Sequence, residues 1–195
     1  MANRTYSRRR WLLETAAASS ALALPTVGLA QERKPGITGQ LAPALKIDWW
    51  IDANGKATSF DVAEARGKWL YLKFWQSWCP GCHRHGLPAL KKFVHKFKDE
   101  PRVVAAGVQT VFEGFSFNTE SKVRKTQLEY DLPIVMGHDS GNPDGQHLPR
   151  TMRNYRSGGT PWVVIVNPDG HVIFNAFHVN VDKLIAYVES DLARA

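Results

Sequence analysis

The alternation of apolar and polar residues predicts a domain in which strands and helices follow one another. In the run Lys68–Trp75, both sets of alternating positions are mainly apolar, which is typical of a strand covered on both faces. Val103–Val111 and Trp162–Val166 have the same character and predict two more buried strands. After residue 82, apolar positions recur at helical spacing, whereas the lysines between them would face water. These apolar positions are Leu87, Leu90, Phe93, Val94 and Phe97.

Turn and capping residues mark the ends of other elements. Asn54-Gly55 lies between two short apolar runs and predicts an N-terminal β-hairpin. Pro168-Asp169-Gly170 predicts a tight turn into a return strand over residues 171–177. Asn118 and Asn180 are the predicted N-caps of two helices, a polar one that ends near residue 130 and an amphipathic one that ends near residue 192.

Two stretches lack a long periodic pattern. Residues 133–136 predict a short strand, and residues 138–159 contain Gly, Pro and Asn with little periodicity. A loop of about twenty residues is long for a compact domain. We therefore expect the second stretch to be a functional loop or to include a short helix.

Residues 1–30 carry an export pattern. Arg8-Arg9-Arg10 precedes an Ala-rich, weakly apolar stretch, which is typical of a twin-arginine signal that is removed before Gln31. A membrane-spanning helix is the alternative, but Pro25 and Gly28 interrupt the apolar stretch. We expect a periplasmic protein with a signal over 1–30, a linker or extended arm over 31–44 and one domain over 45–195.

Charge excludes one class of partner. The formal net charge of +7 falls to +4 when the four arginines and one glutamate of residues 1–30 are removed. The remaining basic residues are spread along the chain and form no block interleaved with aromatic residues. Nucleic acid is therefore not a predicted partner.

The only two cysteines of the chain stand in the motif Cys79-Pro80-Gly81-Cys82, where a strand passes into a helix. A thiolate at a helix N-terminus is stabilised by free N–H groups and by the helix dipole, so the pKa of the first thiol should be lowered. A disulfide between these cysteines would close a loop too small to stabilise the fold much. The motif therefore favours thiol–disulfide exchange over a structural disulfide.

Four motifs in a fixed order resemble a known family. They are Arg66-Gly67-Lys68, Phe74–Cys82, Gly159-Thr160-Pro161 and Asn167-Pro168-Asp169-Gly170. Together they are similar to the thioredoxin-like disulfide oxidoreductases of bacterial envelopes, of the TlpA/ResA type with a redoxin domain. The resemblance implies an α/β thioredoxin fold, with a central mixed β-sheet flanked by helices and an N-terminal β-hairpin. It also implies exchange with protein thiols and disulfides, more readily as a reductase, with a membrane thiol–disulfide protein as electron donor and no organic cofactor.

The resemblance further implies roles for individual residues. Cys79 would be the exposed attacking thiol, and Cys82 would be the buried thiol that resolves the mixed disulfide. Thr160-Pro161 would form a cis peptide beside the cysteines and leave backbone free to pair with a substrate, with an ordinary trans proline as the alternative. Trp78 would contact the partner protein or pack on the rim, whereas Trp75 would pack in the core.

Two positions depart from the family pattern. Lys73 stands where relatives carry a buried acidic or neutral polar residue. An ammonium beneath the helix would lower the thiol pKa and make the couple more oxidising, whereas a lysine at the strand edge would extend into water. The segment from His83 to Gly86, followed by Pro88, predicts a locally irregular, kinked helix. His83 and His85 would lower the pKa of Cys79, bind a metal, or simply face solvent.

Other activities share part of the pattern. Cys79–His83 matches c-type haem attachment, but the aromatic strand before it and the later Thr-Pro strand do not belong to that context. Two thiolates and a histidine suit a copper metallochaperone, although no histidine occurs near Thr160. Thiol peroxidases place a hydroxyl three residues and a proline seven residues before the reactive cysteine, where this chain has Gln76 and Leu72. A binding module on the same fold is the last alternative.

Overall fold

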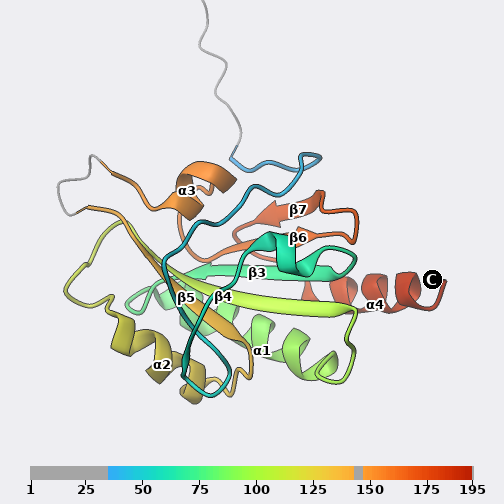
Figure 1. The fold of residues 1–195 in the computed structure, drawn as a ribbon, viewed down its shortest axis with the longest axis horizontal. Helices are drawn as coiled ribbons and strands as arrows, with labels where there is room; N and C mark the ends of the chain where they lie inside the picture. The colour runs from blue at the N-terminus through green and yellow to red at the C-terminus, as the bar shows by residue number, and fades with distance from the viewer. Residues whose placement is uncertain (1–34, 143–146, 195) are drawn as a thin grey trace, which may run out of the picture. The chain divides into compact units, whose positions relative to one another are not determined.

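The computed structural model describes residues 35–142 and 147–194, which form one seven-stranded mixed sheet with helices on both faces (Figure 1). The elements are β1 (Trp49–Ile51), β2 (Ala57–Thr58), η1 (Val62–Ala65), β3 (Trp69–Trp75), η2 (Cys82–Gly86), α1 (Leu87–Lys96), β4 (Val103–Val111), α2 (Glu120–Glu129), β5 (Val135–Ser140), α3 (Arg150–Tyr155), β6 (Trp162–Val166), β7 (Val172–Ala176) and α4 (Val181–Leu192). The predicted mixed sheet flanked by helices is confirmed.

The strand order is β2-β1-β5-β4-β3-β6-β7, which places β3 near the centre of the sheet. β3 pairs in parallel with β4 and antiparallel with β6, so that Lys73 lies opposite Gly107 on one side and Val163 on the other. β1 and β2 form the predicted N-terminal hairpin around Gly55, whose φ of +83° suits glycine. Every residue of β3 is buried, which confirms the prediction of a strand covered on both faces.

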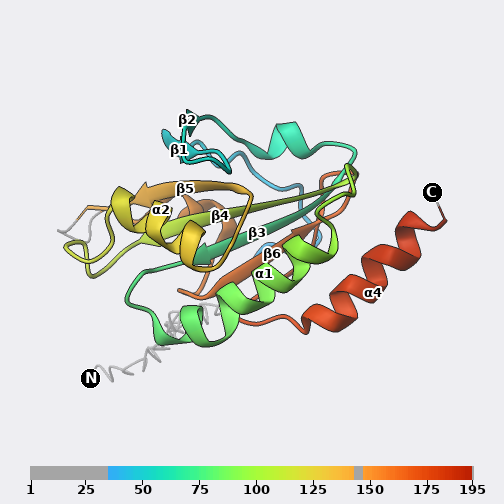
Figure 2. The ribbon, with the colours of Figure 1, turned by 90° about the horizontal axis from the view of Figure 1, so that it is seen from below.

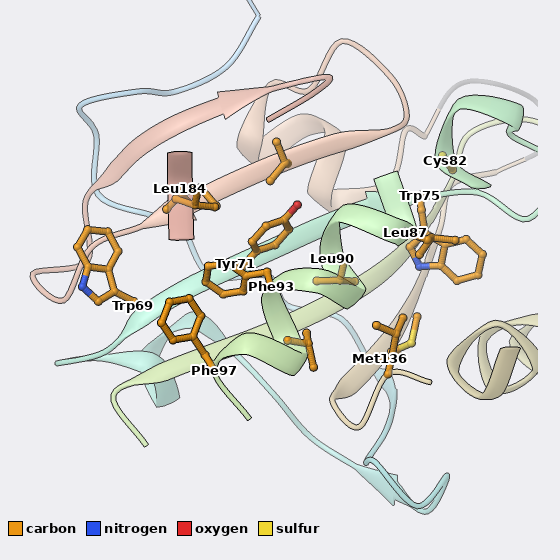
Figure 3. Packing of buried hydrophobic residues seen from close by; sticks show 14 of the residues in the cluster. Trp69, Tyr71, Trp75, Cys82, Leu87, Leu90, Phe93, Phe97, Met136 and Leu184 are labelled. Carbon is orange, nitrogen blue, oxygen red and sulfur yellow. The ribbon is translucent and has the colours of Figure 1, made fainter. Parts of the chain in front are cut away.

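Two layers cover the sheet. α1 and α4 lie side by side on one face, joined at the surface by the ion pairs Lys92–Asp182 and Lys96–Glu189 (Figure 2). Figure 3 shows Trp69, Tyr71 and Trp75 of β3 on this face, with Leu90 and Phe93 of α1 beside them. The other face packs against η1, α3 and the segment before β1. The sheet therefore separates two hydrophobic cores, and β3 supplies side chains to both.

The helix after β3 is irregular, as the sequence predicts. It begins at Pro80, widens to a π-turn over η2, where the Leu87 N–H donates to the Cys82 carbonyl oxygen, and continues as α1. A proline inside a helix cannot donate to the carbonyl four residues earlier, and its ring collides with that carbonyl. The wider turn makes room for Pro88, which is the second residue of α1.

The loops and helix N-termini follow the predictions only in part. The stretch 138–159 hides a short helix, α3, and β5 continues to Ser140, farther than the predicted strand over 133–136. Asn118 does not cap α2, because Thr119 occupies the N-cap position and the Asn118 amide bonds elsewhere. Asn180 does cap α4, since its side chain accepts a hydrogen bond from the Lys183 N–H.

The segment before β1 runs along the domain surface. Ile37 is buried in the second core, and Leu41 forms an isolated β-bridge with His171 beside β7. The predicted signal over 1–30 and the first residues of the predicted linker lie outside the described residues. Within the described ranges, no helix combines the length and the apolar character needed to cross a membrane.

Candidate active site

The two cysteines lie where β3 ends and the following helix begins. Trp75 is the last residue of β3, a turn follows in which the Cys79 N–H donates to the Gln76 carbonyl oxygen, and Pro80 is the first helical residue. Proline suits that position, because the first N–H groups of a helix have no partner within the helix. The sequence therefore places the Cys79 thiol at the helix N-terminus, as predicted.

The two sulfur atoms differ in access. Cys79 is only 5% exposed, so the prediction of an exposed thiol is wrong, while Cys82 is fully buried as predicted. The Cys82 N–H donates to Cys79 Sγ at 3.2 Å, and the Thr160 carbonyl oxygen lies 3.6 Å from the same sulfur. Both residues are free thiols in this structure. An incoming disulfide would therefore meet Cys79 first.

The electrostatics of the pair separate the two thiols further. Hydrogen bonds from the Cys82 thiol, the Cys82 N–H and Thr160 lower the pKa of Cys79 to about 6, although burial opposes them. Burial raises the pKa of Cys82 well above its ordinary value, and the neighbouring Cys79 adds to that effect. At neutral pH the site holds a Cys79 thiolate beside a protonated Cys82.

Thr160-Pro161 lies against this pair. The peptide bond between the two residues is cis, as the sequence resemblance implies. A Cβ added at Gly81 would lie 3.3 Å from Pro161 Cδ, so the glycine of the cysteine motif lets the proline approach the helix start closely. Thr160 also accepts a hydrogen bond from Gln76 Nε2 through its hydroxyl oxygen, at 3.3 Å.

Lys73 lies inside the protein and does not extend into water. Its side chain is buried, and a Cβ added at Gly86 would lie 2.6 Å from Lys73 Cε and 2.8 Å from Lys73 Nζ. The ammonium is therefore beneath the π-turn that follows the cysteines. Burial lowers the pKa of Lys73 to about 8, while interaction with Cys82 and then with Cys79 works in the opposite direction.

The two tryptophans of the motif differ as the sequence suggests. Trp75 is fully buried in the core, although its Nε1 atom has no hydrogen-bond partner. Trp78 is 44% exposed beside Cys79, and its Nε1 donates to Gln76 Oε1 at 3.3 Å. Its ring rests on Gly114, where an added Cβ would lie 2.9 Å from the indole. Trp78 thus offers a fixed apolar surface next to the thiolate.

A buried amide network that the sequence analysis missed holds the loop before Cys79. Asn118 Oδ1 accepts from the Ser77 N–H at 2.7 Å, and Asn118 Nδ2 donates to Gln76 Oε1 at 3.2 Å and to the carbonyl oxygens of Glu113 and Gly114. Gln109 of β4 donates to Ser77 Oγ at 2.6 Å. One sequence feature could have indicated this network, because the polar Gln109 interrupts the apolar run of β4.

His83 belongs to the same support. Its Nδ1 lies 2.8 Å from the Tyr130 hydroxyl, and its Nε2 lies 2.7 Å from the Ser77 carbonyl oxygen. Both ring nitrogens are therefore engaged within the protein. His85 instead stacks edge-on with His178, with ring centroids 5.8 Å apart. No group of three His, Cys, Asp or Glu side chains that could hold a metal ion occurs among the described residues.

Comparisons with known proteins agree with this geometry. Residues 38–175 match the AhpC/TSA family. The chain is 31% identical over 108 residues to the thioredoxin-like protein YneN of Bacillus subtilis, and 25% identical over 134 residues to the thiol-disulfide oxidoreductase ResA of Oceanobacillus iheyensis. These alignments cover 54% and 69% of this chain but only 57% and 62% of the relatives, so the chain spans about three fifths of their lengths.

Solved structures extend the comparison over most of the domain. A thioredoxin-like superfamily protein is 31% identical, with a TM-score of 0.67 and coverage of 78% of this chain and 95% of the other. A thiol-disulfide isomerase from Corynebacterium glutamicum is 30% identical, with a TM-score of 0.62 and coverage of 76% and 95%. The predicted thioredoxin fold, and the resemblance to thioredoxin-like oxidoreductases with a redoxin domain, are confirmed.

Proposed function

The chain belongs to the AhpC/TSA family, and from that premise we propose that it is a thiol–disulfide oxidoreductase of the thioredoxin-like type. Its proposed substrates are disulfides of other proteins, and the proposed direction is their reduction. One observation carries the proposal: Cys79, which is less buried than Cys82 and whose pKa is lowered to about 6, lies beside a fully buried Cys82, whose pKa is raised. A nucleophile and a resolving thiol need these opposite properties.

The geometry supports a two-step exchange. The Cys79 thiolate attacks one sulfur of a substrate disulfide, which forms a mixed disulfide and releases the other substrate sulfur as a thiolate. Cys82 then loses its proton and attacks Cys79 Sγ, which forms the Cys79–Cys82 disulfide and releases the second substrate thiolate. The substrate gains two electrons and the protein dithiol loses two, while solvent and the Cys82 proton supply the two protons. An external dithiol must restore the reduced protein.

Three further residues have proposed roles around this reaction. Trp78 forms the apolar surface that contacts the partner protein, and Thr160 and Pro161 lie beside Cys79 Sγ. Lys73 acts through its charge. Because the hydrogen bonds from Cys82 and Thr160 already explain the low pKa of Cys79, the main effect of Lys73 falls on Cys82, whose thiolate it stabilises during the second step.

The location and the electron donor are also part of the proposal. The twin-arginine pattern in residues 1–30 favours export to the periplasm, and the resemblance to ResA favours a membrane thiol–disulfide protein as the donor. An oxidising compartment would leave the Cys79–Cys82 pair as a disulfide unless a donor reduced it. An exported reductase therefore needs such a donor.

The deciding experiment is the reduction potential of the protein from Gln31 onward, equilibrated in glutathione buffers and measured by alkylation of free thiols. A potential near or below about −250 mV supports the reductase, and one near about −120 mV would instead indicate an oxidant of protein thiols. Cys82→Ser should accumulate mixed disulfides with periplasmic proteins, whereas Cys79→Ser should form none. The absence of any reversible couple would contradict the proposal and favour a binding module.

Peroxide reduction is the competing activity within the same family, and the same protein tests it. Gln76 stands three residues before Cys79, and its amide bonds to Thr160, Trp78 and Asn118, so no hydroxyl is present there to orient a peroxide. We expect slow peroxide turnover in the presence of excess dithiol. Rapid peroxide turnover would instead show that the protein is a thiol peroxidase. Copper delivery is less favoured, because both nitrogens of His83 are engaged within the protein.

A further inference from the structure

A pocket opens between the π-turn, α1, the loop after β7 and the centre of β3. Its volume is about 330 Å³. It is lined by Tyr71, Lys73, His85, Ala89, Phe177 and His178, among others. The exchange reaction described above uses only Lys73 of these residues. The pocket is therefore a second feature of the molecule that shares one charged group with the thiol site.

Two polar side chains that line this pocket, those of Tyr71 and Lys73, are buried. The Tyr71 hydroxyl is buried and has no hydrogen-bond partner, although a buried tyrosine hydroxyl usually finds one. Lys73 Nζ makes no hydrogen bond or ion pair with any residue that the structure describes, and its side chain is 2% exposed. Both side chains come from the same face of β3, two residues apart, and both line the pocket.

The charge of the lining selects the kind of acceptor. No aspartate or glutamate lines the pocket among the described residues, while Lys73 is cationic at neutral pH and His85 and His178 add two imidazoles. An anion in the pocket would gain charge-assisted hydrogen bonds from an ammonium that water reaches poorly. The pocket therefore has the electrostatics of an anion site.

The remaining lining selects the size and character of the anion. Phe177, Ala89 and Val179 supply the apolar part of the lining. A volume of about 330 Å³ lies at the lower end of the range found for small-molecule sites. An inorganic ion would leave this apolar lining facing water, whereas the hydrocarbon part of an organic acid would cover it.

We propose that this pocket binds a small organic carboxylate. Its carboxylate oxygens accept hydrogen bonds from Lys73 Nζ and the Tyr71 hydroxyl, and its apolar part lies against Phe177 and Ala89. Gly86 leaves room for the Lys73 headgroup, because a Cβ at that position would occupy its space. The proposal names a ligand class that thiol–disulfide exchange does not require.

Binding would also regulate the thiol site, and this part rests on the proposed function. Lys73 is the one cation that both a bound carboxylate and a Cys82 thiolate would use. The disulfide form carries no thiolate, so the carboxylate should bind more tightly to the disulfide form than to the dithiol form. By linkage, the carboxylate would then shift the redox equilibrium toward the disulfide by the same factor.

The test uses butyrate and benzoate as probes on the disulfide form, at constant ionic strength with chloride as the balancing anion. Titrations are followed by calorimetry and by amide NMR shifts. We expect saturable binding, with the largest shifts at Gly86, Ala89 and residues 177–179. Tyr71→Phe should weaken binding about tenfold, as expected for loss of a hydrogen bond to a charged group. Tyr187→Phe, the same change at an exposed tyrosine of α4, should leave binding unaltered.

The outcomes separate this inference from the proposed function. Shifts that never saturate, binding that Tyr71→Phe does not weaken, or equal binding of phosphate would each overturn the carboxylate site, whatever the redox result. Lys73→Met should abolish saturable binding, and retained binding would overturn the site as well. If the protein shows a reversible dithiol–disulfide couple in glutathione buffer but binds no carboxylate, only the carboxylate site is rejected. If it binds carboxylate but shows no such couple, only the exchange reaction is rejected.

Discussion

The two faces of β3 are built from the same seven residues and have opposite characters. Leu70, Leu72 and Phe74 point into the core under η1 and α3, and they carry only hydrocarbon. Tyr71, Lys73 and Trp75 point toward α1, and each carries a polar atom that finds no hydrogen bond in the described protein. β3 therefore contributes only hydrocarbon to one core and buried polar groups to the other.

This difference separates stability from chemistry. An apolar side chain stabilises the fold when it is buried, whereas a polar atom without a partner costs free energy. The face toward α1 accepts that cost at the positions next to the cysteines and the pocket. We infer that the apolar face supports the fold and that the α1 face supports the reaction, and four substitutions test this division.

The largest effect is expected on the apolar face. Leu72→Ala leaves a cavity in a fully buried site and should lower the free energy of unfolding by about 2–5 kcal/mol. The pKa of Cys79, measured by thiolate absorbance, should stay near 6, because its causes lie with Cys82 and Thr160. A shift of that pKa by a unit or more in a folded Leu72→Ala protein would show that the two faces are not separable.

Lys73→Met tests the opposite face and should stabilise the protein. Burial lowers the pKa of Lys73 from 10.5 to about 8, so the buried ammonium opposes folding at neutral pH. Methionine fills a similar volume without charge, and we expect a gain of about 1–3 kcal/mol in urea unfolding of the disulfide form at pH 7.

The gain should depend on pH with a definite sign. The folded-state pKa of Lys73 is the lower one, so the cost of its charge is complete below pH 8 and is relieved as the pH rises from 8 toward 10.5. The advantage of Lys73→Met should shrink over that interval. The variant should also raise the pKa of Cys82 and slow the resolution of mixed disulfides. A gain that is constant from pH 7 to 10 would place Lys73 in contact with water.

Much of this architecture follows from local sequence. The strands β3, β4 and β6 can be predicted because short, continuous apolar runs are typical of buried strands. The position of the cysteine motif then follows from the end of β3. α3 escapes such reasoning, because its N-terminus is held by Asp139 of β5, whose carboxylate accepts from the N–H groups of Arg150 and Thr151. A cap from eleven residues away leaves no local signal.

The supports of the site escape for the same reason. Asn118 lies 41 residues after Ser77, and only the pairing of β3 with β4 brings the loops that follow them together. The sequence places Lys73 on β3 but does not decide between burial and water. That choice depends on Gly86, which removes a Cβ from the space of the ammonium. Side chains that depend on two distant segments are thus the part that the sequence could not supply.

Gly86→Ala tests this dependence and should have a smaller effect. The backbone at Gly86 is helical, so alanine alone would favour the helix by up to about 1 kcal/mol. The new Cβ would meet Lys73 Cε at 2.6 Å and Pro161 Cβ at 3.0 Å, and we expect a net loss of about 1 kcal/mol. In a Lys73→Ala background the loss should disappear. An equal loss in both backgrounds, measured by urea unfolding, would assign the clash to Pro161 instead.

The smallest effect is expected from removing one hydroxyl on each face. Tyr155 is buried in the core that the apolar face of β3 helps to form, and its hydroxyl donates to the Pro43 carbonyl oxygen at 2.6 Å. Tyr155→Phe should therefore cost about 1 kcal/mol of unfolding free energy. The Tyr71 hydroxyl has no partner, so the same change there should be neutral or should stabilise the free protein by up to about 1 kcal/mol.

The sign for Tyr71→Phe should then reverse when the pocket is filled. A carboxylate that accepts from the Tyr71 hydroxyl stabilises only the wild-type protein, so saturating benzoate should raise the melting temperature of wild type more than that of Tyr71→Phe. Tyr155→Phe should gain as much from benzoate as wild type does, because its hydroxyl lies on the far side of β3. If both tyrosine variants lost stability equally with and without benzoate, the Tyr71 hydroxyl would have a partner within the protein, and the contrast between the two faces would fail.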